Sequence, residues 1–174
     1  MLRDLTISGC YLDEEDNVAG ILQMDACSSK MEERNNVEFH RLSFINNYNW
    51  GGSLIVVSDP DCYRIDMQHV VFQSNHYMQQ CQLSSLNDLV NVTFIENKLF
   101  EDTSASISLF RMPPGSNTTV NLVTAEDNAG TLFQVDQASI SIRNSVFSRM
   151  AACRMGVIFA NASDISISTS FFED

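Results

Sequence analysis

The sequence predicts an all-β fold, a right-handed parallel β-helix of about seven coils. Two observations predict it: a strand pattern that recurs at irregular intervals, and apolar residues that fall at fixed offsets within each copy. Residues 1–174 are expected to form a single segment of such a helix, since this length suffices for one continuous core. We expect this segment to be part of a longer chain or assembly.

The clearest repeat element is the motif Phe-x-x-Asn, which occurs at residues 44–47, 72–75 and 94–97. With each Phe taken as an anchor, weaker copies are expected with anchors at Leu12, Ala125, Phe147 and Phe172. The seven anchors lie about 27 residues apart on average, which is within the range of solenoid repeats.

Each anchor is preceded by a strand with one apolar face. The position five residues before the anchor is apolar in all copies: Ile7, Phe39, Met67, Leu89, Val120, Ile142 and Ile167. The positions seven and two residues before it are apolar in five of seven copies, and Cys10 falls in the second of these columns. Alternation between the first two columns has the period of a strand, and the change of phase before the anchor requires a bend.

A second short apolar strand follows a loop of variable length, at residues 20–22, 52–56, 107–110, 130–133 and 156–159. In a parallel stack, equivalent residues lie about 4.8 Å apart, so the Phe anchors are expected to stack. The amides of Asn47, Asn75, Asn97 and Asn128 are expected to form a hydrogen-bonded chain. An antiparallel β-sandwich is the alternative, but the Asn-Gly and Asp-Gly pairs typical of its hairpins are absent.

Composition restricts the partners of the chain. A net charge of −12 disfavours binding to nucleic acid or to anionic lipid. No run approaches the roughly 18 apolar residues of a membrane span, so no membrane insertion is expected. The cysteines show no spacing typical of zinc sites, and no metal or cofactor is expected, with calcium as the open alternative.

The Phe-x-x-Asn motifs and the Gly51-Gly52-Ser53-Leu54 segment after the first of them resemble the passenger repeats of chlamydial polymorphic outer membrane proteins, and similar repeats in protist surface proteins. The family's second motif is Gly-Gly-Ala-Ile, which this chain matches only in part. The resemblance implies a β-helix displayed outside the cell and used for adhesion.

Three carboxylates, those of Glu38, Asp66 and Asp88, stand six residues before successive anchors and are expected to lie on neighbouring coils, facing outward. With His69 they form a candidate catalytic set, because pectin-degrading β-helix enzymes place acidic clusters on outer strand faces. A pectin-lyase-like polysaccharide lyase or glycoside hydrolase is therefore the alternative function. A solvated polar ladder is the simpler interpretation, and it predicts no catalysis.

Three sequons, at Asn91, Asn117 and Asn161, mark candidate glycosylation sites. Cys62 is a candidate for a disulfide with either Cys27 or Cys81.

The leading hypothesis is a non-enzymatic structural or adhesive module, extracellular or on the cell surface, that stacks end to end into a filament. Its expected partners are further copies of itself or flanking coils of a longer chain, with carbohydrate as another candidate.

Overall fold

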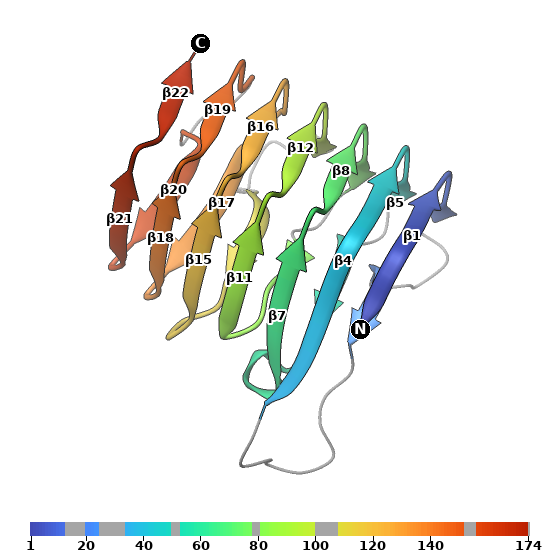
Figure 1. Ribbon diagram of the computed structural model, residues 1–174, viewed down its shortest axis with the longest axis horizontal. Helices are drawn as coiled ribbons and strands as arrows, with labels where there is room; N and C mark the ends of the chain where they lie inside the picture. Colours follow the sequence, from blue (N-terminus) through green and yellow to red (C-terminus); the bar gives the residue numbers. More distant parts are fainter. Residues whose placement is uncertain are drawn as a thin grey trace.

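The computed structural model is an all-β solenoid, in which seven rungs follow one another along the molecule (Figure 1). It describes residues 1–12, 20–24, 34–49, 53–77, 81–99, 108–151 and 156–173. All strand pairings among these residues are parallel. The predicted parallel β-helix is thereby confirmed, and the antiparallel sandwich is excluded.

One broad sheet carries all seven rungs. Its longest strand, β4 (Asn35–Ile45), pairs with β1 (Leu2–Ser8) on one side, and on the other side the sheet continues as two parallel rows of shorter strands. One half continues through β7 (Tyr63–Gln68), β11 (Leu86–Val90), β15 (Asn117–Asn121), β18 (Ser139–Arg143) and β21 (Asp164–Ser168). The other half continues through β8 (Val71–Gln73), β12 (Thr93–Ile95), β16 (Thr124–Glu126), β19 (Val146–Ser148) and β22 (Phe171–Glu173).

The chain returns to the broad sheet through shorter strands. After the asparagine position come β2 (Tyr11–Leu12), β5 (Tyr48–Asn49), β9 (His76–Tyr77) and β13 (Lys98–Leu99), which pair with one another. The return strands are β3 (Gly20–Met24), β6 (Ser53–Val57), β10 (Cys81–Gln82), β14 (Ser108–Met112), β17 (Thr131–Asp136) and β20 (Ile158–Asn161). A single 3₁₀ turn, η2 (Pro60–Cys62), precedes β7 in the described part. The last rung is described only as β21 and β22, so the complete turns are slightly fewer than the seven coils predicted.

The predicted register is confirmed from the second rung onward. Phe44 pairs with Phe72 and Phe72 with Phe94, and the column continues through Ala125, Phe147 and Phe172. The first rung is different from the prediction, because the residue that pairs with Phe44 is Ile7, and not Leu12.

The predicted bend within each rung is a single residue in the left-handed conformation. It stands three residues before the anchor, with φ between 49° and 57° in every rung. The residues at this position are Asp4, Arg41, His69, Asn91, Leu122, Asn144 and Thr169. A non-glycine residue pays a steric cost there, which for Thr169 is increased by its branched Cβ. The same distortion in every rung keeps neighbouring backbones parallel, so the bend is compatible with continuous pairing.

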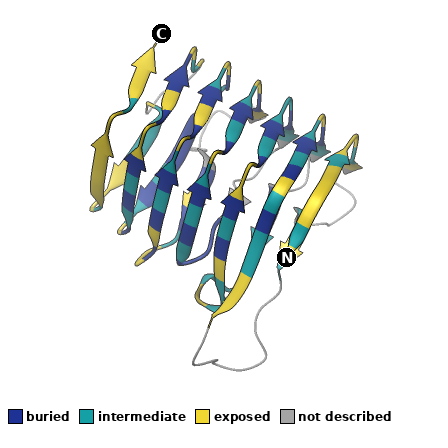
Figure 2. Cartoon of the chain, in the orientation of Figure 1, coloured by how far each residue is buried: buried dark blue, intermediate teal, exposed yellow. Residues whose placement is uncertain are grey.

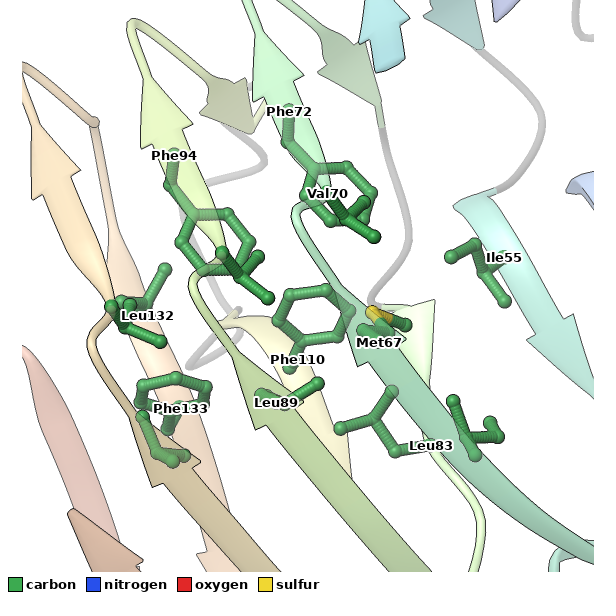
Figure 3. Packing of buried hydrophobic residues seen from close by; sticks show 14 of the residues in the cluster. Ile55, Met67, Val70, Phe72, Leu83, Leu89, Phe94, Phe110, Leu132 and Phe133 are labelled. Atoms are coloured by element: carbon green, nitrogen blue, oxygen red, sulfur yellow. The ribbon is translucent and has the colours of Figure 1, made fainter. Parts of the chain in front are cut away.

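The inward side chains form one continuous apolar core (Figure 2). The Phe44 and Phe72 rings stack with centroids 4.9 Å apart, and the Phe72 and Phe94 rings with centroids 5.2 Å apart. The ring of Phe110, on the return strand β14, packs edge-on against those of Phe72 and Phe94, with centroid distances of 5.6 and 5.4 Å (Figure 3). Aromatic pairs in these geometries are stabilised beyond their burial alone.

The predicted asparagine chain is present at the second bend. The side-chain Nδ2 groups of Asn47, Asn75 and Asn97 each donate to the Oδ1 of the asparagine in the next rung at 2.9 Å. Each also donates to the carbonyl oxygen of the anchor in the preceding rung. The same Oδ1 atoms accept from the backbone N–H of the preceding rung, so the buried amides are fully hydrogen-bonded.

Candidate functional site

The predicted acidic ladder lies on the outer face of the broad sheet. Glu38 on β4 pairs in register with Asp66 on β7, which pairs with Asp88 on β11. Parallel pairing places equivalent residues of adjacent strands about 4.8 Å apart, so these carboxylates are close enough to repel one another. The three strands therefore bring the predicted residues together as a row.

Arg64 neutralises two of these carboxylates. It lies on β7 two residues before Asp66, on the same outward face. Its Nε donates to an Asp66 oxygen at 3.1 Å, and its Nη2 donates to an Asp88 oxygen at 2.6 Å. The hydrogen bond to Asp66 raises the pKa of the Arg64 guanidinium, and Asp88 adds to this effect. The guanidinium thus bridges the carboxylates of two adjacent rungs.

Glu38 has a separate partner in its own strand. Its Oε1 accepts a hydrogen bond from the Nδ2 of Asn36 at 2.9 Å. Within the described residues, no group of three or more His, Cys, Asp and Glu side chains is arranged to hold a metal ion. The ladder is chemically a row of hydrogen-bonded, partly ion-paired carboxylates on an open strand face.

His69 does not join the acidic ladder. It occupies the left-handed bend, three residues after Asp66, and among the described residues no hydrogen bond or ion pair joins it to the three carboxylates. Proton transfer between a catalytic pair needs contact at about 3 Å, or through one water. The structure therefore brings the three carboxylates together and leaves His69 apart from them.

His69 lies instead against His40. Their ring centroids are 5.7 Å apart, and the Nδ1 of His40 is buried without a hydrogen-bond partner. Desolvation lowers the pKa of His40, and the nearby charges of Arg41 and Arg3 lower it further. Beside this pair, Nη2 of Arg41 donates to a carboxylate oxygen of Asp4 at 2.8 Å, which links the first two rungs.

The three sequon asparagines are all exposed. Asn91 stands at the bend between β11 and β12, Asn117 begins β15, and Asn161 ends β20. Each side chain is therefore accessible in the folded chain. Glycosylation of these three asparagines stays a prediction.

Cys62 is disulfide-bonded. Of its two predicted partners, Cys27 lies outside the described residues, and Cys81 is described only as part of the backbone of β10. The pairing therefore stays a prediction.

The prediction that Cys10 lies two residues before an anchor is wrong. Ile7 is the anchor of that rung, so Cys10 stands three residues after it, in the asparagine column. Its backbone N–H donates to the Oδ1 of Asn47 at 3.1 Å, and its thiol is free. At the other end of the column, Nδ2 of Asn128 lies 3.9 Å from the sulfur of Met150.

The residue that sequence reasoning missed in this site is Arg64. Its position could have been found, because strand alternation places Arg64 and Asp66 on one face. The buried polar group at Asn87 was also missed: its Nδ2 donates to the Oγ1 of Thr118 at 3.0 Å and to the carbonyl of Ser84 at 2.8 Å.

Comparison with known proteins gives no identification. No model of a protein family matches the chain, and no curated protein matches it. Among the described residues, no helix has the length and apolar character needed to cross a membrane.

Proposed function

We propose that this chain is a non-enzymatic structural and adhesive β-solenoid module, displayed outside the cell or on its surface. The observation that carries the proposal is the stack of parallel rungs, in which Phe anchors stack from the second to the fourth rung and hydrogen-bonded asparagines join the second to the fifth. A core of this kind makes a stiff rod with an extended outer surface, which suits a spacer or a display scaffold.

Two further features support an extracellular location. The disulfide at Cys62 is typical of oxidising compartments, and the sequon asparagines are exposed to a glycosylating enzyme. The resemblance of the Phe-x-x-Asn repeats to those of chlamydial surface passengers is the basis for proposing adhesion.

The alternative is a polysaccharide lyase or hydrolase that uses the acidic ladder. The proximity of Asp66 and Asp88 on adjacent rungs favours it, but their shared contact with Arg64 favours a structural role. Carboxylates that act as acid or base must be free to reach the substrate, whereas these two are held by a guanidinium.

Incubation with acidic and neutral polysaccharides separates the two functions. We expect no new reducing ends and no unsaturated sugar products with any of them. Turnover that is lost in Asp66→Asn and kept in the control variant Glu173→Gln, at the far end of the broad sheet, would establish the enzyme and refute the proposal.

Adhesion requires its own measurement. Beads coated with the chain are expected to be retained on cell monolayers under flow, more strongly than beads coated with a protein of equal net charge. Equal retention of the two kinds of bead would remove the adhesive part of the proposal.

A further inference from the structure

We infer that His40 and His69 form a binding site for a transition-metal ion such as Zn²⁺, which joins the second and third rungs. His40 belongs to β4, and His69 follows directly after β7, which lies beside β4 in the broad sheet (Figure 1). The site is separate from the acidic ladder. The inference goes beyond the proposed structural function and does not depend on it.

The strand register brings the two imidazoles together on the outer face. His40 pairs with Gln68, and His69 is the next residue along the chain. The residue before His40, Phe39, is fully buried, so strand alternation directs the imidazole of His40 outward. His69 stands at the left-handed bend, where its side chain is exposed. Two adjacent rungs thus present one imidazole each to the same side of the sheet.

The separation of the rings is that of two imidazoles on one metal ion. Zn–N bonds are about 2.0–2.1 Å long and the coordination is tetrahedral, which places the centres of two bound imidazole rings about 5–6 Å apart. The ring centroids of His40 and His69 are 5.7 Å apart, and the ring planes are tilted by 48°. The backbone therefore already holds the two rings at the separation that a shared ion requires.

One ring nitrogen of His40 lacks a partner. Its Nδ1 atom is buried and makes no hydrogen bond. A buried polar atom without a partner costs free energy, and such atoms are rare in folded proteins. Coordination to an ion held between the rings gives this nitrogen a partner, and rotation of the exposed His69 side chain admits the ion.

The charges around the two rings admit a cation. The guanidinium of Arg41 is already bound, because its Nη2 donates to a carboxylate oxygen of Asp4 at 2.8 Å. Arg3, which is in register with His40, is exposed, so solvent and salt screen its charge. Glu38 stands two residues before His40 on the same face, and the net charge of the chain is −12. The field of the whole chain therefore attracts cations.

The ligand atoms select the class of ion. Imidazole nitrogen suits zinc, copper and nickel, whereas calcium and magnesium prefer oxygen ligands. Among the described residues, no third His, Cys, Asp or Glu completes a metal-binding group with the pair. The remaining coordination positions are open to water, as in zinc sites that are not closed by four protein ligands.

Calorimetric titration with zinc chloride at pH 7.5 tests the site, because imidazole coordinates in its neutral form. The unsubstituted chain is expected to bind one zinc ion through the pair. His40→Asn and His69→Asn are each expected to weaken this binding by about tenfold or more, since loss of a group that merely orients a ligand already costs that much. The chain has three histidines, so His76→Asn is the matched control, and it is expected to bind zinc like the unsubstituted chain.

Asparagine is the replacement that the bend tolerates. Asn91 and Asn144 occupy the same left-handed position in other rungs, and asparagine is enriched in this conformation, so His69→Asn is expected to fold. Circular dichroism compares each variant with the unsubstituted chain. If His40→Asn fails to fold, the comparison of His69→Asn with His76→Asn decides the question alone.

Pulsed electron spin resonance with Cu²⁺ in place of zinc counts the bound imidazoles. Two are expected in the unsubstituted chain and in His76→Asn, and one in His69→Asn. Zinc is also expected to raise the midpoint of thermal unfolding of the unsubstituted chain, because the ion binds the folded chain across two rungs. This rise is expected to be absent in His69→Asn.

Three results overturn the inference: no saturable zinc binding to the unsubstituted chain, unchanged zinc binding in His40→Asn or His69→Asn, or a single imidazole on copper in the unsubstituted chain. Unchanged binding in both variants would place the ion on another group, such as the free thiol of Cys10. The proposed structural and adhesive function rests on other observations and is not altered by any of these results.

Discussion

The asparagine amides show how single residues hold adjacent rungs together. Nδ2 of Asn97 donates to the carbonyl of Phe72 at 2.8 Å and to the Oδ1 of Asn128 at 2.9 Å, and its own Oδ1 accepts from both nitrogens of Asn75. No shorter or apolar side chain satisfies this set, since a buried donor or acceptor without a partner costs free energy.

Asn97→Ala is therefore expected to lower the free energy of unfolding by about 2–4 kcal/mol, because it leaves buried groups of Asn75 and Phe72 without partners. Urea unfolding measures the change. Asn36→Ala is the control: its side chain is exposed and makes one contact with Glu38, so a change of less than about 0.5 kcal/mol is expected. Similar losses of unfolding free energy in the two variants would show that the asparagine chain stabilises the fold no more than an exposed hydrogen bond does.

His40 predicts a dependence of stability on pH. Burial lowers its pKa from the ordinary value of 6.5, with further lowering by Arg41, Arg3 and the neighbouring His69 and a smaller opposing effect of Asp4. The unfolded chain therefore takes up a proton at higher pH than the folded chain does. The contribution of neutral His40 to stability is therefore fully present above about pH 6.5 and is lost as the pH falls through the pKa that His40 has in the folded chain.

We expect His40→Asn to reduce the loss of unfolding free energy between pH 7 and pH 5, measured by urea titration at each pH. His76, whose pKa is lowered by burial and by Lys98, keeps its contribution in this variant. An unchanged pH profile in His40→Asn would show that His40 is protonated equally in the folded and unfolded chains.

At the scale of strands, most of the rung register could be predicted from the sequence, since the offset columns repeat in each rung from Phe44 onward. The first rung could not be predicted. Ile7 and Phe44 are separated by more residues than any other neighbouring anchors, and Leu12 fitted the mean spacing better. Pairing in a solenoid depends on the strands, so a long insertion between them changes the spacing of the anchors without changing the register.

The acidic ladder was predicted correctly as a set of neighbours, whereas its chemistry depended on a residue outside the column. The offset analysis compared equivalent positions in different rungs, and Arg64 stands two positions away within β7. Side chains at different positions on one strand face contact each other as readily as side chains at equivalent positions of neighbouring rungs. The ion pairs of Arg64 could therefore be identified only in the three-dimensional structure.

Removal of Arg64 is expected to convert the ladder into a calcium site. In Arg64→Ala, Asp66 and Asp88 lose their shared guanidinium while remaining on adjacent rungs. Two or three carboxylates without a compensating charge favour an oxygen-binding divalent cation. With a dissociation constant of about 1 mM, 10 mM calcium would stabilise the variant by about 1.4 kcal/mol.

Thermal unfolding with and without calcium measures this effect, with magnesium as a comparison. The unsubstituted chain and the control Arg111→Ala, which removes an exposed arginine from β14, are expected to show no calcium dependence. Calcium stabilisation of the unsubstituted chain would mean that the cation displaces Arg64 and would revive the predicted calcium alternative.

At the scale of the whole molecule, each rung pairs with its neighbours, and within the described residues no strand pairing reaches beyond the adjacent rung. Stability in such a stack is a sum of rung terms and nearest-neighbour terms, so the end rungs, each with one neighbour, open most readily. Leu89 on β11 and Val120 on β15 are fully buried in the middle, whereas every residue of β21 is exposed.

Hydrogen exchange measured by mass spectrometry is therefore expected to be slowest in β11 and β15 and at least tenfold faster in β21 and β22 at low protein concentration. Uniform exchange rates along the stack would instead show that the rungs open together, and the additive description of the solenoid would then be wrong.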